Sequence, residues 1–372
     1  MNQTLPLSHT DILPDILPPL LQWYPAQADN RQLPWRESPT PYHTWLSEIM
    51  LQQTRASAVI PYYERFLDAL PDIPALAAAD ETLLMKLWQG LGYYSRARNL
   101  QKAARIIMDR HHGKLPQDQS ALQNLPGIGP YTAGAIGAIA WGKPWPAVDG
   151  NVLRIVSRVL ASSADIASAR TRRAVTDALS PLYPSGSSAG ALNQAFMDLG
   201  ATICLPHGAP HCPRCPLAAL CLAHEAGREQ DFPVKKAARP RRVEQYTVLL
   251  LRQGNTYALH QRPKKGLLAG LWEFPNLPGK AASQQIRKYL RQYGLTADSL
   301  VPLPEARHIF SHVEWKLSGW LICLAAPCCI VADSSLPLRW VTPQEIAKTY
   351  SVPAAFSHYL PYLYHPTTKS MK

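Results

Sequence analysis

The sequence predicts a two-domain chain, in which an all-α domain is followed by an α+β domain. Its 372 residues suggest two domains and allow each a core of its own. Apolar residues recur at helical spacing before residue 224, whereas segments such as EQYTVLLLR, NTYALHQR and WKLSGWLICL after Glu244 are typical of strands. We therefore expect a helical domain at 1–224, a basic, proline-interrupted linker at 225–243 and an α+β domain at 244–372.

Composition limits the class of protein and its partners. A hydrophobic content of 47% is that of a globular chain. The net charge of +12 favours a polyanionic partner, although a solvated basic surface would give the same figure. There is no apolar run of membrane-spanning length and no secretory signal pattern at the N-terminus. We expect a monomer with no membrane partner, cytoplasmic and nucleoid-associated, or nuclear if the source is eukaryotic.

Most of the first domain is expected to be helical. Asp80 is a candidate N-cap, and Gly90 and Gly113 are candidate C-terminal stops. The expected helices cover residues 18–24, 43–54, 55–70, 80–89, 93–112, 170–182 and 189–199. In the second domain one helix is expected near residues 282–293.

A carboxylate lies inside one of these helical patterns. Glu48 stands among the apolar residues Trp45, Leu46, Ile49 and Met50. Partial desolvation among such neighbours raises the pKa of a carboxyl group towards that of a useful proton donor. The alternative is a glutamate at the edge of an ordinary amphipathic helix.

A glycine-rich turn, followed by one carboxylate, marks residues 125–151. Gly127 and Gly129 have no Cβ, so the backbone there can turn sharply and approach another backbone closely. The N–H groups of the turn and of the helix after it could hold a phosphate. Asp149 follows twenty residues after the turn. A lone Gly-x-Gly more often only caps a helix.

Four of the seven cysteines are crowded into one loop. An uneven count without an export signal favours metal ligation and free thiols over a disulfide framework. Such dense thiolates suit a four-iron cluster or a zinc ion, and zinc sites more often pair two Cys-x-x-Cys units, of which this loop has one. The four are Cys204, Cys212, Cys215 and Cys221. No function is assigned to Cys323, Cys328 and Cys329.

The segment GLGYYSRARN at 90–99 combines apolar, aromatic and cationic residues. Leu91 and Tyr93 are followed by Arg96 and Arg98. A wedge residue and a stacking ring beside cations could hold a base stack open after a nucleotide has been extruded. The alternative is a helix–helix corner with core aromatics, which we accept for Tyr94.

Several motifs around the residues named above resemble those of a known family. LPGIG followed by VDGN resembles the helix-hairpin-helix DNA glycosylase superfamily, and LPWR with WLSEIMLQQT resembles the adenine DNA glycosylase family (the MutY type) within it. The resemblance implies excision of adenine paired with 8-oxoguanine or guanine in double-stranded DNA. It implies that Glu48 is the catalytic acid and that Asp149 stabilises the cationic sugar.

The same resemblance assigns the other site residues. The adenine pocket would be lined by Arg31, Trp35, Arg36, Leu51 and Gln194. DNA and the mispair would be contacted by Gln53, Thr54, Leu91, Tyr93, Gly127 and Gly129. For Gln194 an exposed helical position is an equally good interpretation on chemistry alone.

Position 131 bears on the reaction type. Related strand-cleaving glycosylases have a lysine there, which forms a Schiff base with the sugar, and this chain has Tyr131. Without an amine C1′ cannot be captured as an imine, so we expect a monofunctional glycosylase. Tyr131 would orient the reacting centre, and Asn151 would position Asp149 or cap the following helix.

The second domain resembles the Nudix fold. A Nudix hydrolase helix needs several glutamates to hold magnesium, and the comparable stretch at 287–294 has Lys288, Arg291 and Gln292 at those positions. The resemblance therefore implies a recognition module for 8-oxoguanine rather than a hydrolase. Its recognition loop would be formed by Phe310, Ser311 and His312.

The family resemblance also implies a [4Fe–4S] cluster on the four crowded cysteines. One departure concerns Cys204, because seven residues separate it from Cys212 where the family has six. His207 and His211 are weak substitutes as ligands. Competing hypotheses are a strand-cleaving glycosylase of the endonuclease III kind, a non-enzymatic iron–sulfur DNA-binding protein and, least supported, a Nudix nucleotide hydrolase.

Overall fold

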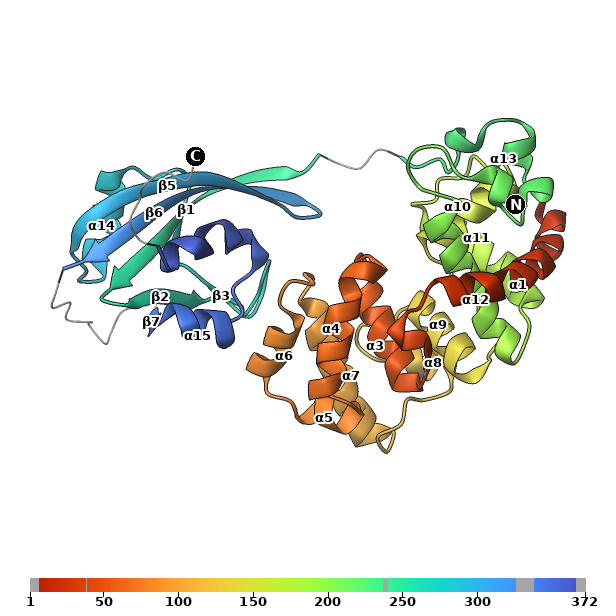
Figure 1. The fold of residues 1–372 in the computed structure, drawn as a ribbon, viewed down its shortest axis with the longest axis horizontal. Helices are drawn as coiled ribbons and strands as arrows, with labels where there is room; N and C mark the ends of the chain where they lie inside the picture. The colour runs from red at the N-terminus through yellow and green to blue at the C-terminus, as the bar shows by residue number, and fades with distance from the viewer. Residues whose placement is uncertain (1–6, 38, 237–239, 326–337, 366–372) are drawn as a thin grey trace, which may run out of the picture. The chain divides into compact units, whose positions relative to one another are not determined.

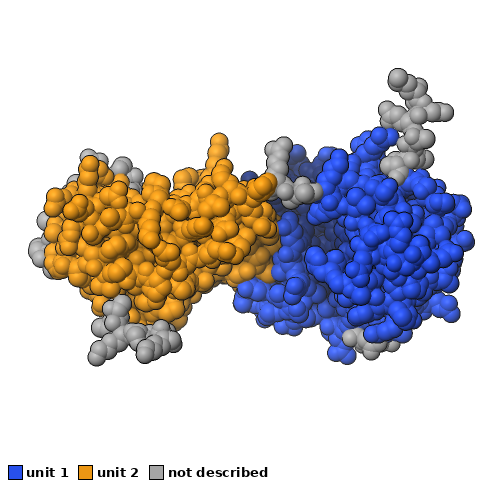
Figure 2. Space-filling model, turned by 90° about the horizontal axis from the view of Figure 1, so that it is seen from above, with its two compact units in different colours: residues 1–78, 98–237 blue, residues 79–97, 238–372 orange. Residues whose placement is uncertain are grey.

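The computed structural model describes residues 7–37, 39–236, 240–325 and 338–365. The chain divides into two compact units, which Figure 2 colours separately. The first comprises residues 1–78 and 98–237, and the second comprises residues 79–97 and 238–372. None of the helices in the described ranges is long and apolar enough to cross a membrane.

The first unit is built from helices, as expected (Figure 1). Its α-helices are α1 (Leu13–Asn30), α2 (Pro34–Glu37), α3 (Pro41–Leu51), α4 (Ala56–Ala69), α5 (Ile73–Ala78), α7 (Ser95–Arg110, which begins in the second unit), α8 (Gln119–Gln123), α9 (Pro130–Trp141), α10 (Gly150–Val159), α11 (Ala169–Leu179), α12 (Ser187–Thr202) and α13 (Leu222–Glu225). Short 3-10 turns are η1 (Thr10–Ile12), η2 (Ser180–Leu182), η3 (Cys212–Arg214), η4 (Ala218–Leu220) and η5 (Glu229–Asp231).

Helices distant in sequence share one core of the first unit. Apolar side chains of α1, α10, α11 and α12 are buried together there. Small residues allow α9 to approach its neighbours closely. A Cβ on Gly137 would lie 1.9 Å from the Trp145 ring, and one on Gly134 would lie 2.6 Å from the Pro146 carbonyl oxygen. This close packing fixes the segment that carries Asp149.

The second unit is organised on one seven-stranded sheet. Its strands are β1 (Arg242–Gln253), β2 (Thr256–Gln261), β3 (Trp272–Glu273), β4 (Asn276–Pro278), β5 (Ala297–Ile309), β6 (Val313–Leu324) and β7 (Leu338–Val341). The main order is β3-β2-β1-β6-β5, and β4 and β7 pair with β1 and β2. Strands β1 and β6 run parallel, and the other pairs are antiparallel.

Successive residues of β1 point to opposite faces of this sheet, and each face has its own core. Val248 and Leu250 join a core with α15 (Pro343–Lys348) and the 3-10 helix η6 (Ala354–Leu363). Leu249 and Leu251 join a second core under α14 (Ser283–Gln292). The sheet is therefore covered on both faces.

A helical segment of the N-terminal half belongs to the second unit by its contacts. In α6 (Glu81–Trp88) Asp80 is the N-cap, since its carboxylate accepts the Thr82 N–H. Lys86 donates to the Tyr350 carbonyl at 3.4 Å. Gln89, just after the helix, donates to the Val352 carbonyl at 2.9 Å.

The predicted fold class, helical domain plus α+β domain, is confirmed. Helix α1 is longer than the expected 18–24, because prolines 18, 19 and 25 are accommodated inside it. Strand β5 was missed, since its sequence ADSLVPLPEARHI carries two prolines and several charges and only two of its residues are buried. Strand β6 pairs with it, which shows that tertiary pairing outweighs local propensity here.

Candidate active site

Glu48 lies in the middle of α3 and is buried. The start of the helix is capped, because the Thr40 side chain accepts the His43 N–H and Pro41 occupies the first turn. Only 4% of Glu48 is exposed, and neighbouring Trp45 and Leu46 are fully buried. The sequence placed this carboxylate among apolar neighbours, and the structure does the same.

Tyr131 is the direct partner of Glu48. Its hydroxyl, at the start of α9, donates to Glu48 Oε2 at 2.8 Å. Burial raises the pKa of Glu48 to about 7, and the nearby Asp149 charge also raises this pKa, while the Tyr131 hydrogen bond and Arg36 lower it. Near neutral pH Glu48 is thus poised to give up a proton.

Asp149 has a different environment, because it caps α10. One of its oxygens accepts the Asn151 and Val152 N–H groups at 2.8 and 2.9 Å. The other accepts the Asn151 side-chain amide at 2.8 Å. Burial raises the pKa of Asp149, and these three donors oppose that effect by favouring the ionised form. Of the two roles suggested for Asn151, the structure shows the first, since its amide donates to Asp149, whereas the cap of α10 is Asp149 itself.

A buried arginine that the sequence analysis missed lies behind this cap. Arg154 donates to Asn151 Oδ1 at 3.0 Å and to the Gly200 carbonyl at 2.8 Å. Its Nε donates to the Cys204 carbonyl at 2.8 Å. A Cβ on Gly200 would lie 2.6 Å from Asn151 Cβ, so α12 can approach the cap only at a glycine.

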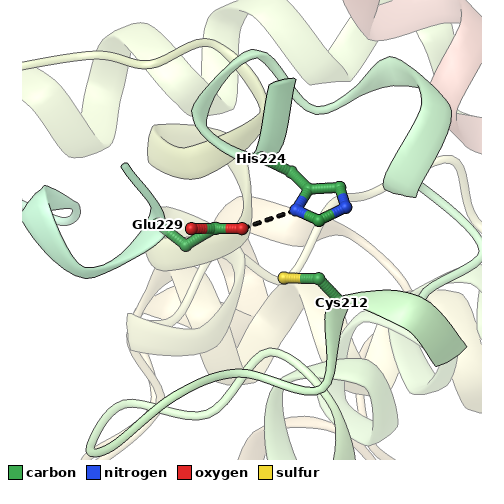
Figure 3. Close-up of side chains that lie close together, drawn as sticks. All are labelled: Cys212, His224 and Glu229. Carbon is green, nitrogen blue, oxygen red and sulfur yellow. Dashed lines mark hydrogen bonds and ion pairs between the residues drawn. The ribbon is translucent and has the colours of Figure 1, made fainter. Parts of the chain in front are cut away.

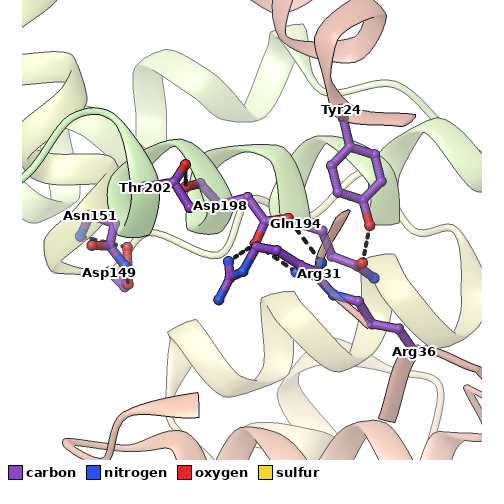
Figure 4. A network of polar contacts seen from close by, with 8 residues as sticks. All are labelled: Tyr24, Arg31, Arg36, Asp149, Asn151, Gln194, Asp198 and Thr202. Atoms are coloured by element: carbon purple, nitrogen blue, oxygen red, sulfur yellow. Dashed lines mark hydrogen bonds and ion pairs between the residues drawn. The ribbon is translucent and has the colours of Figure 1, made fainter. Parts of the chain in front are cut away.

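Glu48, Tyr131 and Asp149 line two cavities of the first unit, of about 590 and 740 Å³. The first is also lined by every residue expected in the adenine pocket, namely Arg31, Trp35, Arg36, Leu51 and Gln194. Thr54 lines the first cavity and Gln53 the second. The residues of the expected adenine pocket come from the end of α1, from α2, from α3 and from α12. Figure 4 shows Arg31, Arg36 and Gln194 among them.

Of the two glycines in the glycine-rich turn, only Gly127 has a backbone conformation that requires glycine. Gly127 has φ +83, a conformation that side chains rarely adopt, so the sharp turn depends on it. Gly129 is the N-cap of α9 with φ −92 and has open space where a Cβ would lie. Gly129 is therefore not needed for the turn itself, and its phosphate contact remains a prediction.

The four crowded cysteines lie together. Cys204, Cys212, Cys215 and Cys221 are free thiols that line one small cavity. The extra residue before Cys212 is accommodated by the loop, which closes through a hydrogen bond from His211 N to the Ile203 carbonyl. His207 and His211 are exposed.

Their environment suits a thiolate-bound metal group. Burial, followed by the Glu229 carboxylate and the neighbouring thiols, raises the pKa of Cys212 to about 11, and burial with the neighbouring thiols raises that of Cys215 to about 12. A bound cation would remove this cost of ionisation. Arg158 also donates to Cys204 Sγ at 3.2 Å. Figure 3 shows that His224 and Glu229 form a hydrogen-bonded pair beside Cys212. The sequence gave no reason to expect this pair.

In the second unit the two expected wedge residues differ in exposure. Tyr93 is 43% exposed and has φ +46, whereas Leu91 is only 6% exposed. Of the two, only Tyr93 is accessible from the surface, and the contact of either with DNA remains a prediction. Arg96, which sequence analysis treated only as a flanking cation, donates to the Leu91 and Gly92 carbonyls and stacks on the Tyr93 ring at 5.5 Å.

The expected recognition loop is the turn between β5 and β6. Ser311 and His312 are exposed at its tip. Phe310 is half-buried and packs edge-on against Trp315 with ring centroids 4.9 Å apart. Helix α14, in place of the Nudix catalytic helix, has the sequence SQQIRKYLRQ, which contains no carboxylate.

Comparisons with known proteins identify the family. A model of the HhH-GPD superfamily of base excision DNA repair proteins matches residues 46–181, and a NUDIX domain model matches residues 246–361. The adenine DNA glycosylase of Rattus norvegicus is 36% identical over 385 residues, covering 88% of this chain and 73% of that protein. That of Buchnera aphidicola (from Acyrthosiphon pisum) is 31% identical over 307 residues, covering 82% and 85%.

The chain belongs to the adenine DNA glycosylase family. Part of the chain is also similar to a solved DNA glycosylase of another specificity: a thermostable thymine-DNA glycosylase matches 57% of this chain and 96% of its own, with 27% identity and a TM-score of 0.50. The family resemblance drawn from the sequence is confirmed, as is the enzyme class, a DNA N-glycosylase of base excision repair.

The raised pKa of Glu48 leads to a prediction for the pH dependence of the reaction. If Glu48 acts as an acid, the protonated form is active, so the single-turnover rate should be constant at low pH and fall as pH rises through about 7. Tyr131→Phe removes the hydrogen bond that lowers this pKa, so the midpoint should move to higher pH. Rates measured with saturating enzyme from pH 5 to 9 test this, with DNA affinity followed in parallel. A rate that rises through pH 7 would contradict the assignment.

Proposed function

We propose that this protein hydrolyses the N-glycosidic bond of adenine paired with 8-oxoguanine or guanine in double-stranded DNA. The observation that carries the proposal is the pair of buried carboxylates in one cavity with different hydrogen-bond partners. Glu48 is buried with a raised pKa, and Asp149 is held by three N–H donors. One can deliver a proton while the other stabilises positive charge, the division of labour used by glycosidases.

In the proposed reaction adenine is rotated out of the stack into the cavity lined by Arg31, Trp35 and Gln194. Glu48 protonates a ring nitrogen of the base, for which N7 is our candidate, and makes adenine a better leaving group. The C1′–N9 bond breaks and leaves an oxocarbenium-like sugar, whose charge Asp149 stabilises. Water then adds to C1′ and loses a proton, which leaves an abasic site in an intact strand.

Tyr131 supports a monofunctional reaction. Its hydroxyl is committed to Glu48, and it has no amine that could attack C1′. We assign it to orienting the Glu48 carboxyl.

We also propose a division of labour along the chain. Residues 1–224 would carry catalysis, residues 225–243 would link the domains, and residues 244–372 would recognise the mispair. Ser311 and His312 at the exposed β5–β6 turn would contact 8-oxoguanine, with Phe310 anchoring the turn on Trp315. Gln53, Thr54 and Tyr93 would contact the DNA around the lesion, and Leu91 would do so only if it leaves its buried position.

The cysteine loop is proposed to bind a [4Fe–4S] cluster through Cys204, Cys212, Cys215 and Cys221. Four free thiols lining one cavity support this, as does the cost of ionising Cys212 and Cys215 without a metal group. When bound, the cluster would supply structural order to the loop. The hydrogen bond from Arg154 to the Cys204 carbonyl would connect that order to the Asp149 cap.

A duplex with one labelled adenine opposite 8-oxoguanine tests the reaction. After incubation with protein, we expect strand breakage only in the portion treated with alkali, because excision leaves an abasic site without cutting the strand. Glu48→Gln should bind this duplex normally and lose about 10²- to 10⁴-fold in single-turnover rate, since it has no proton to give. Breakage without alkali would indicate a strand-cleaving enzyme, and normal turnover by Glu48→Gln would remove Glu48 from its role.

The recognition turn can be tested separately from catalysis. Ser311→Ala combined with His312→Ala should reduce the preference for 8-oxoguanine over guanine opposite adenine, because these polar side chains lie exposed at the tip. The measurement is the ratio of single-turnover rates for the two mispairs, with the enzyme in excess of the DNA but below saturation. Ser299→Ala on β5 serves as the control. An unchanged ratio in the double variant would assign recognition elsewhere.

The cluster proposal predicts metal content. The protein purified without oxygen should contain about four iron and four sulfide per chain, with visible absorbance. Cys215→Ser should lower the iron content and the thermal stability together, while Cys323→Ser in the second unit should change neither. Stoichiometric zinc in place of iron would overturn the assignment.

A further inference from the structure

Asp198 is a fully buried carboxylate that the reaction as described does not use. It lies on α12, one turn after Gln194, so both side chains project from the same face of the helix. Its side chain has 0% exposure. An ionised group so placed must be compensated by partners, since desolvation of an unpaired carboxylate costs several kcal/mol.

The partners are the two arginines of the base pocket. Arg36 makes a two-pronged contact, with Nη1 donating to Oδ2 and Nη2 donating to Oδ1, both at 2.9 Å. Arg31 donates to Oδ1 as well. Figure 4 shows both guanidinium groups converging on Asp198 from separate segments of the chain. A fork-like contact fixes both the position and the plane of a guanidinium.

Gln194 is fixed by a different residue. The Tyr24 hydroxyl on α1 donates to Gln194 Oε1 (Figure 4). Arg36 lies over the Tyr24 ring at 5.8 Å, so the two sets of contacts are joined. Tyr24 is absent from the residues lining the 590 Å³ cavity, whereas Gln194 lines it. Tyr24 therefore stands behind Gln194 rather than at the base.

We propose that Asp198 and Tyr24 are positioning residues that set the hydrogen-bonding pattern of the base pocket. Asp198 locks Arg31 and Arg36, and Tyr24 locks the amide of Gln194 with its oxygen turned away. This inference rests on the proposed function, because it concerns how the same cavity selects its base.

The donor groups that these contacts do not use determine which kind of ligand the pocket can bind. A guanidinium has only N–H donors, five in all, and Asp198 takes two from Arg36 and one from Arg31. Gln194 has its carbonyl engaged, so its NH₂ group remains for a ligand. The remaining groups are therefore donors, which suit a purine with unsubstituted ring nitrogens such as N1 and N3 of adenine, while N7 is left to Glu48.

The test separates binding of the base from binding of the DNA. One duplex carries 2′-fluoro-2′-deoxyadenosine opposite 8-oxoguanine, since the fluorine destabilises the cationic sugar and prevents excision. A second carries a tetrahydrofuran abasic analogue at that place and leaves the pocket empty. The readout is the ratio of the two dissociation constants, which a general structural defect would leave unchanged.

Tyr24→Phe removes only one oxygen and should lower the preference for the base-containing duplex about fivefold. Asp198→Asn keeps the shape of the side chain and removes its charge. It should lower the preference for the base-containing duplex by about 30-fold or more. Affinity for the abasic duplex should stay within about twofold in both. The matched control is Thr202→Val, which removes a hydrogen bond to the Asp198 backbone carbonyl and touches neither arginine.

Equal weakening of both duplexes, or no change in Tyr24→Phe, would overturn the proposal. Tyr24→Phe keeps the test decisive if Asp198→Asn fails to fold. A wild-type protein that excises adenine while the variants keep its base preference would refute the inference alone. A wild-type protein that neither excises adenine nor favours the base-containing duplex would refute the proposed function.

Discussion

The arrangement of the site depends on one buried cation, Arg154. From α10 it donates to the Asn151 side chain, to the Gly200 carbonyl on α12 and to the Cys204 carbonyl in the cysteine loop. Burial lowers the pKa of this guanidinium, and it remains charged because its ordinary pKa is so high. Arg154 thus joins the start of α10 to the chain between the end of α12 and the cysteine loop. Asn151 in turn holds Asp149, so the order of the cysteine loop and the position of Asp149 share a physical cause.

The two carboxylates of the cavity differ because their donors differ. Asp149 accepts three N–H groups as the cap of α10, and such donors stabilise the ionised form. Glu48 lies mid-helix, where the backbone N–H groups are committed to the helix, and it accepts from a single Tyr131 hydroxyl. Burial raises the pKa of both groups, to about 7 for Glu48, and the three donors oppose that rise at Asp149. Local backbone structure therefore distinguishes the two carboxylates.

The sequence predicted best where a local pattern carries the structure. The apolar positions around Glu48 predicted its helix, whereas Asp149 was singled out by the resemblance of Val-Asp-Gly-Asn to a family motif, and its role as the cap of α10 was not predicted. The motif containing Gln194 also contains Asp198, yet nothing local reveals that its carboxylate meets Arg31 and Arg36 from more than 160 residues away. Tyr24 had no motif at all. The burial of Leu91 and the presence of strand β5 were not predicted for the same reason, since both depend on packing partners remote in sequence.

The same remote contacts decide the electrostatics of the cavity. Arg36 lowers the pKa of Glu48, so an unpaired guanidinium there would work against proton donation. Asp198 neutralises part of that charge through two hydrogen bonds and is itself fully buried. The cavity thus holds two arginines beside a glutamate whose pKa is raised to about 7. The two features coexist because a further buried carboxylate, Asp198, offsets part of the arginine charge.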